Sequence, residues 1–186
     1  MFKHPLQFSL AFTLISVCLT TAVSVMAAPE NASPTTQIEA DALKYNEKQR
    51  LSTFTGAVKL VRGDLKIQGD RLDLQEFDGG RQKGVATGKP AQFEKEQAQA
   101  DSPNVIEKVR GFANKITYDT ANDTLVLEGN AKLQRWRNGK LNDETQGQRI
   151  TYVDASGVFT VEGSPSASQP KRVTATIGPK PAKDAP

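Results

Sequence analysis

The chain has 186 residues, a formal net charge of +3 and only 6% aromatic residues. This composition disfavours a general nucleic-acid binder, which needs a strong positive field and stacking rings. The single cysteine, Cys18, and the single histidine, His4, both lie within the first 27 residues. A chain cleaved after them would hold no disulfide, no imidazole base and no zinc site of thiolate or imidazole ligands. We therefore expect no catalytic residue, no metal and no cofactor.

Residues 1–27 have the layout of a secretory signal peptide. Lys3 gives a positive start, an apolar and small-residue stretch runs from Leu6 to Met26, and a cleavage site follows Ala27. An uncleaved membrane anchor is the alternative, because the stretch is nearly long enough to span a bilayer. Serine and threonine dilute the apolar run and a polar, proline-containing segment follows it, so the sequence favours cleavage.

The segments at the two ends of the remaining chain are polar and contain proline. Residues 28–36 (APENASPTT) predict a disordered leader, and residues 178–186 (GPKPAKDAP) predict a disordered tail, because neither can bury apolar surface. Residues 37–177 lie between them and are numerous enough for one domain with its own core.

Apolar residues alternate with polar ones along most of residues 37–177. Phe54, Val58 and Leu60 share one parity, and Leu125 and Leu127 repeat the pattern. A period of two is typical of half-buried strands. Turn-forming stretches such as VRGD, DTANDT and RNGK separate the runs. Since no apolar stripe at helical spacing exceeds a turn or two, the sequence predicts an all-β domain.

A tyrosine followed eleven positions later by a glycine occurs three times, with an alternating run between them. A weaker copy has Leu74 in place of the tyrosine and Gly88 at the corner. Recurring strand units with glycine corners predict stacked layers of strands that bury a shared apolar face. The three pairs are Tyr45 and Gly56, Tyr118 and Gly129, and Tyr152 and Gly163.

The alternation places one set of apolar side chains on the inward face of the stacked strands. An ordinary core and the lining of an open groove are both compatible with this pattern. The inward set is Ile38, Phe54, Val58, Leu60, Leu65, Ile67, Phe93, Ile116, Leu125, Leu127, Leu133 and Ile150.

Several stretches, in this order and spacing, resemble the OstA-like family of lipopolysaccharide transport proteins. They are IEAD, TFTGAVKLVRGDLKIQGDRLDL, GKPAQF, and LVLEGNAKL followed by GQRITY. The resemblance covers Gln37 to about Ile177. It implies a twisted, slightly open β-jelly roll of stacked antiparallel strands, with an apolar interior groove formed by the inward set. The segment Arg135–Gly147 is longer than the family usually has between those strands, and Thr36 is polar where the family often has an inward apolar residue.

The resemblance also implies a function and partners. The function is a periplasmic bridge that binds lipopolysaccharide, shields its acyl chains and carries it from the inner to the outer membrane. The implied partners are lipopolysaccharide, the like β-domains of an inner-membrane-anchored, LptC-like component and of an outer-membrane, LptD-like translocon, and further copies of the chain joined head to tail. The alternative is a periplasmic β-structured assembly module that binds only proteins.

Other polar signals in the sequence are weaker. The basic clusters around Lys66, Arg137 and Arg172 could meet phosphates, but a nearly balanced total charge favours a solvated face. Carboxylate pairs such as Glu94/Glu96 and Asp143/Glu144 could serve a glycosidase, although adjacent pairs are expected by chance among 21 acidic residues. No phosphate-binding GxxxxGK[ST] loop is present. The sequence therefore predicts a protein that is not an enzyme.

Overall fold

The computed structural model describes residues 34–99, 102–164 and 172–179. The predicted signal peptide, most of the predicted leader and most of the predicted tail lie outside these described residues. Two short 3₁₀ turns, η1 (Asp78–Gly80) and η2 (Asp154–Ser156), accompany the strands. The strands are β1 (Thr36–Glu39), β2 (Ala42–Asn46), β3 (Leu51–Arg62), β4 (Leu65–Glu76), β5 (Gln82–Gln99), β6 (Ser102–Asp119), β7 (Thr124–Arg137), β8 (Lys140–Val153), β9 (Val158–Glu162) and β10 (Thr174–Ile177).

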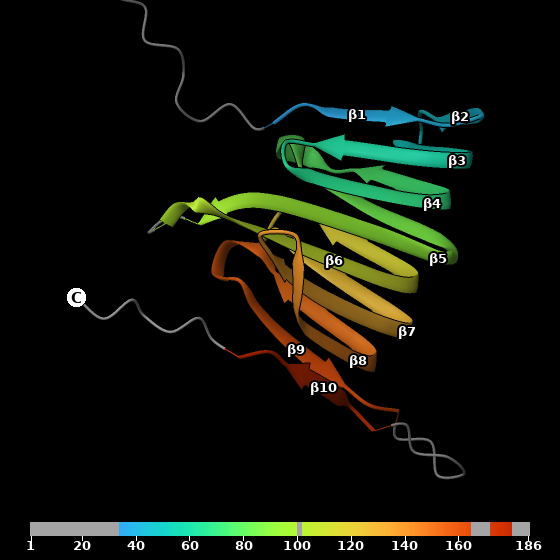
Figure 1. Ribbon diagram of the computed structural model, residues 1–186. Helices are drawn as coiled ribbons and strands as arrows, with labels where there is room; N and C mark the ends of the chain where they lie inside the picture. Colours follow the sequence, from blue (N-terminus) through green and yellow to red (C-terminus); the bar gives the residue numbers. More distant parts are fainter. Residues whose placement is uncertain (1–33, 100–101, 165–171, 180–186) are drawn as a thin grey trace, which may run out of the picture. The chain divides into compact units, whose positions relative to one another are not determined.

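The strands form one antiparallel sheet that stays open. Their order is β1-β3-β4-β5-β6-β7-β8-β10, with β2 also paired to β3 and β9 also paired to β8. Figure 1 shows the strands stacked in this order from β1 and β2 at one end to β9 and β10 at the other. Because the two ends do not pair with each other among the described residues, the prediction of an all-β, slightly open roll of stacked antiparallel strands is confirmed.

The six long strands β3 to β8 all break their pairing register along one line across the sheet. The last regular rung before the break joins Thr55, Arg71, Thr87, Lys115, Glu128 and Arg149. Irregularities of this kind bend a strand, and a line of them bends the whole sheet. The line divides the sheet into two arms, each of which contains half of every long strand.

We name each arm after its first edge strand. The β1 arm contains β1, residues 58–62, 65–69, 91–99, 102–113, 131–137 and 140–147, and β10. The β2 arm contains β2, residues 51–55, 71–76, 82–87, 115–119, 124–128 and 149–153, and β9.

The apolar faces of the two arms pack against each other. Phe93 of the β1 arm stacks on Tyr152 of the β2 arm, with ring centroids 6.1 Å apart. At Gly111 of the β1 arm an added Cβ would lie 2.7 Å from the Leu127 side chain of the β2 arm, so glycine permits the close approach. One continuous cluster of buried residues therefore fills the space between the arms.

Glycines occupy the bend in the two best copies of the repeat, as predicted. Gly56 and Gly129 each have a φ of +80°, and Ala57 and Asn130 after them also have positive φ. A β-branched or bulky residue rarely adopts such a backbone, whereas glycine does so without strain. Gly88 of the weaker copy lies in the register break of β5. Gly163 differs, because it follows the end of the short edge strand β9 and makes no bend within a strand.

The repeated tyrosine also has a structural counterpart. Cross-strand pairing joins the repeat positions into one rung of the β2 arm, two positions outside the rung that holds Leu127. Side chains on one rung share a face of the sheet, so the repeat reflects one layer of the interior. The rung consists of Tyr45, Ser52, Leu74, Gly84, Tyr118, Leu125, Tyr152 and Phe159.

We predict that Leu127→Ala strongly destabilises the domain. Leu127 is 0% exposed, and deletion of a fully buried leucine side chain typically lowers the free energy of unfolding by about 2–5 kcal/mol. Lys132→Ala on the outward face of the same strand is the matched control, because its weak ion pair with Glu144 at 3.8 Å contributes little. Urea unfolding followed by circular dichroism measures both. Equal losses in the two variants would contradict the packing described here.

Candidate functional site: the apolar interior and its rim

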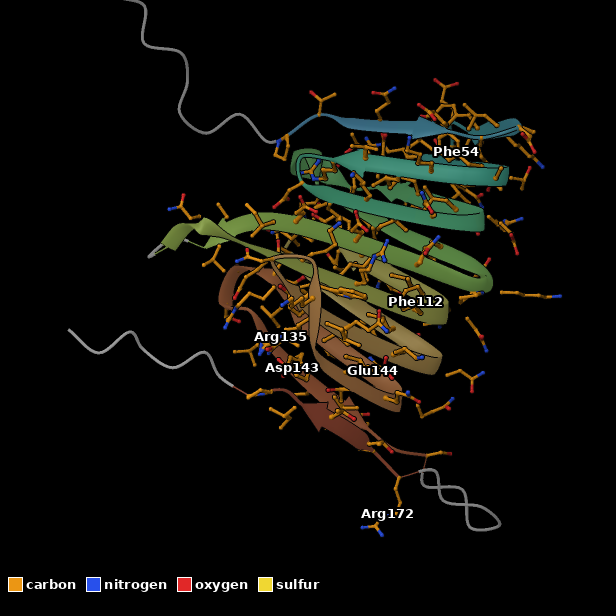
Figure 2. The ribbon with its side chains drawn as sticks, in the orientation of Figure 1. Phe54, Phe112, Arg135, Asp143, Glu144 and Arg172 are labelled. Carbon is orange, nitrogen blue, oxygen red and sulfur yellow. The ribbon has the colours of Figure 1, made fainter. Side chains whose placement is uncertain are left out.

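The structure brings all twelve predicted inward residues into one cluster between the arms. Ile38 and Phe54 are partly buried and pack against the cluster from its β1 and β2 end, and the other ten are buried. Figure 2 labels Phe54 on β3, close to the edge strands. The uptake of lipid by this cluster is not tested by its burial and stays a prediction.

Several interior residues were absent from the predicted set. Leu72 and Leu74 continue the alternation of β4, and Tyr118 and Tyr152 lie on the repeated rung. Four alanines, Ala86, Ala91, Ala113 and Ala131, are each no more than 2% exposed and lie close to the bend line. Parity with a neighbouring leucine or phenylalanine could have identified these residues, but small side chains give little hydropathy signal on their own.

A narrow pocket enters the interior near the β1 and β2 end of the stack. Its walls are mainly aliphatic, and the polar residues Thr36, Arg62, Gln82 and Thr120 also line it. The aliphatic lining comes from both arms, so the pocket lies between them and reaches the shared core. The lining includes Leu60, Ile67, Leu72, Leu74 and Ala86.

Beyond the apolar rungs, the β1 arm ends in a rim that carries cations. Lys95 follows Phe93 by two residues and therefore faces inward with it. Its Nζ donates a hydrogen bond to Oδ2 of Asp154, a residue of η2 at the end of the β2 arm. The same Nζ lies 3.4 Å from Oδ2 of Asp64. The Lys95 side chain is only 13% exposed, so this ion pair crosses from one arm to the other with little contact to water.

Aromatic side chains of the β2 arm face this rim. Tyr118 donates from Oη to Oδ1 of Asp123 at 3.0 Å. Burial, together with this nearby carboxylate, raises the pKa of Tyr118 to about 12. Burial also raises the pKa of Tyr152. The guanidinium carbon of Arg135 lies 5.6 Å from the ring centroid of Phe159, within the range of a cation–π contact.

Most charged side chains on the outer face are paired with one another. Arg71 binds Asp73 at 2.7 Å, and Lys115 binds Glu128 at 2.6 Å. Such pairs keep a solvated surface nearly neutral. The basic cluster that the sequence suggested around Lys66 and Arg71 therefore belongs largely to this paired outer surface, as the balanced total charge indicated.

Glu96, Asp143 and Glu144, three members of the carboxylate pairs considered for catalysis, have lowered pKa values, which is opposite to the raised pKa of a general acid. A hydrogen bond from Lys108 lowers the pKa of Glu96, and hydrogen bonds from Gln134 and Gln146 lower the pKa of Glu144. The pKa of Asp143 is also lowered, because hydrogen bonds and the adjacent Arg135 outweigh burial. Figure 2 shows Arg135 and Asp143 together on neighbouring strands.

In the part of the chain that the structure describes, no group of three or more His, Cys, Asp or Glu residues is arranged to hold a metal ion. Within the same residues, no helix has the length and apolar character needed to cross a membrane.

Comparison with known proteins gives consistent matches. A family model described as "LptA/(LptD N-terminal domain) LPS transport protein" matches residues 37–158. The lipopolysaccharide export system protein LptA of Escherichia coli K12 is 28% identical over 180 residues, which cover 96% of this chain and 89% of that protein. The lipopolysaccharide export system protein LptH of Pseudomonas aeruginosa is 24% identical over 159 residues, covering 83% and 85%.

A solved structure shows the same fold. It is the crystal structure of LptH, described as the LptA-homologous periplasmic component of the lipopolysaccharide transport device of Pseudomonas aeruginosa. It aligns with a TM-score of 0.65 and 21% identity, covering 78% of this chain and 96% of that one.

The raised pKa of Tyr118 predicts a stability change at alkaline pH. An unfolded tyrosine ionises near pH 10, whereas folded Tyr118 stays neutral to about pH 12. Its contribution to stability is complete below about pH 10 and is lost as the pH rises towards 12. Between about pH 10 and pH 12, we expect the free energy of unfolding of wild type to fall by about 2 kcal/mol more than that of Tyr118→Phe. Urea unfolding at several pH values tests this. If the free energy of unfolding has the same pH dependence in the variant as in wild type, Tyr118 ionises as readily in the folded as in the unfolded protein.

Proposed function

The chain belongs to the family of LptA and LptD N-terminal-domain lipopolysaccharide transport proteins, and we propose that it is a periplasmic bridge that binds lipopolysaccharide between its arms and carries it from the inner to the outer membrane. The observation that carries the proposal is the continuous apolar interior between two arms whose rims are not joined by any of the described strands. The names of the relatives, which are lipopolysaccharide export proteins, support the same role.

The physical task of such a bridge is to keep acyl chains out of water. At about 0.8 kcal/mol per methylene, a twelve-carbon chain resists transfer into water by roughly 9 kcal/mol. An apolar interior that runs across all the stacked strands removes this barrier without any covalent chemistry. We propose accordingly that the protein is not an enzyme and that a partner supplies the energy for movement.

The two ends of the stack offer edges for like β-domains. All four residues of β10 are exposed at one end, and β1 and β2 form the other end. Unpaired backbone groups on such edges accept a further strand. Joining the C-terminal edge of one copy to the N-terminal edge of the next is an open, head-to-tail contact that extends the interior. The same edges suit the like domains of an inner-membrane, LptC-like partner and an outer-membrane, LptD-like partner.

The alternative is an assembly module of the same fold that binds only proteins. Large apolar side chains on the edge strands support it, since Leu43 and Tyr45 of β2 are 60% and 54% exposed. This alternative needs no lipid between the arms, and the next experiment separates the two proposals.

Photo-crosslinkers placed in the interior should capture lipopolysaccharide in living cells. We expect labelling from Phe54 on β3 and Phe93 on β5, which contribute to the core. Lys59 on β3 and Lys132 on β7 face outward and should give little labelling. Labelled lipopolysaccharide is detected by immunoblotting. Equal labelling from both faces, or labelling by proteins alone from the interior, would favour the protein-binding module.

Removal of the C-terminal edge strand should abolish self-association. Deletion of residues 172–186 removes β10, which pairs only with the edge of β8 among the described strands, and should leave the long strands folded. Deletion of residues 180–186 keeps β10 and is the matched control. Sedimentation at rising concentration should show a monomer for the first variant and wild-type association for the second. Unchanged association of the first variant would place the contact elsewhere.

A further inference from the structure

Three cations share one inward-facing rung at the rim of the β1 arm. Cross-strand pairing places Arg62 on β3, Lys95 on β5 and Arg135 on β7, so a cation recurs on every second strand. Strands lie about 4.8 Å apart, which puts the backbones of neighbouring members roughly 10 Å apart and those of Arg62 and Arg135 roughly 20 Å apart along the stack. The full rung is Thr36, Arg62, Leu65, Lys95, Val109, Arg135, Asp143 and Ile177.

Acceptors on the same arm orient two of these cations. Arg62 donates from Nη1 to the Pro34 carbonyl oxygen at 2.9 Å and to Thr36 Oγ1 at 3.1 Å. Arg135 lies 3.3 Å from Asp143 through its Nε. Both side chains therefore have hydrogen-bond acceptors at the boundary between the apolar interior and solvent.

Lys95 is the central cation, and the carboxylate that it binds has one oxygen without a hydrogen bond. Asp154 accepts its hydrogen bond through Oδ2, and Oδ2 of the more exposed Asp64 lies 3.4 Å from the same Nζ, while Oδ1 of Asp154 is buried without a hydrogen-bond partner in the described residues. An ion pair removed from water is usually no more stabilising than apolar side chains of similar size. Stability alone therefore gives no reason for a lysine where the alternation of Ala91 and Phe93 would continue the core.

We propose that Lys95 binds the phosphate group of an amphiphile whose acyl chain lies between the arms, that Asp154 occupies Lys95 until the amphiphile enters, and that Arg62 and Arg135, two strands away on either side, add positive charge to the rim. This inference rests on the proposed function and adds a residue-level site for the anionic group. A phosphate offers several acceptor oxygens to ammonium and guanidinium donors, which the single bonded oxygen of Asp154 does not. The exchange of Asp154 for phosphate also separates the rims of the two arms, because the Lys95–Asp154 pair joins them.

Calorimetry with three probes below micelle concentration tests the proposal on the full chain. Decyl phosphate carries both groups, decanol carries only the acyl chain, and inorganic phosphate carries only the anion. We expect wild type to prefer decyl phosphate to both. Lys95→Met should weaken decyl phosphate binding about tenfold relative to decanol, and Lys95→Arg should keep the preference. Asp154→Asn should bind decyl phosphate about threefold more tightly, since Lys95 no longer has to leave this carboxylate.

Lys108→Met is the matched control, because Lys108 pairs with Glu96 at 2.7 Å near the β5–β6 hairpin and lies on no inward rung. It should leave all three affinities unchanged. If Lys95→Met does not fold by circular dichroism, the opposite effect expected of Asp154→Asn carries the test.

The outcomes separate the inference from the proposed function. A folded Lys95→Met or Asp154→Asn variant with the wild-type ratio of decyl phosphate to decanol affinity would overturn the rim site alone. Decyl phosphate binding no tighter than that of inorganic phosphate would also overturn it, because the acyl chain would then make no contribution. Failure of every acyl probe, together with no interior crosslinking to lipopolysaccharide, would overturn the proposed function as well.

Discussion

The fold depends on one constraint: each long strand is apolar on one face, and an open sheet has no second sheet to cover that face. The chain meets this constraint by bending every long strand along the same line, so that the two halves of one sheet cover each other. Positive-φ pairs at Gly56 and Gly129 provide the backbone for two of these bends. Because both arms contain the same strands, the core runs the length of the stack, and so does its rim. The interior, the edges and the rim are all consequences of this arrangement.

The same geometry sorts charge by parity and not by distance along the sequence. Arg62 and Lys66 belong to one cluster in the sequence, yet Arg62 lies on the inward rim rung while Lys66 faces Glu94 at 3.8 Å on the outer surface. Arg135 is separated by many residues from Arg62 but shares its rung. Since Debye screening is strong on the outer face and weak at a partly buried rim, the inward cations would interact with a ligand of the kind proposed more strongly than their number suggests.

The sequence predicted those features of the fold that repeat periodically along the strands, and missed those that do not. Alternation identified the inward set, and the tyrosine–glycine repeat identified a true rung and two true bends, because both patterns repeat with the strand geometry. Contacts between the arms follow no period. The pair of Lys95 and Asp154 spans 59 residues, and nothing in either local sequence marks it. Parity with Phe93 could have placed Lys95 inward, but only knowledge of how the sheet folds on itself could have supplied its partner.

Under the proposed function, the architecture also determines what an entering acyl chain would have to disrupt. Backbone ladders run within each arm, whereas the contacts between the arms are made by side chains, such as the stack of Phe93 on Tyr152. A chain that parts the arms therefore exchanges one set of apolar contacts for another and leaves the backbone hydrogen bonds intact. Each methylene that enters is favourable by about 0.8 kcal/mol, which offsets the contacts it separates. The bend line joins the arms along their whole length, so they can part at the rim while staying together at the base. An interior that its own side chains fill when no acyl chain is bound is thus compatible with reversible loading. Such an interior also keeps its apolar surface away from water in the unloaded state.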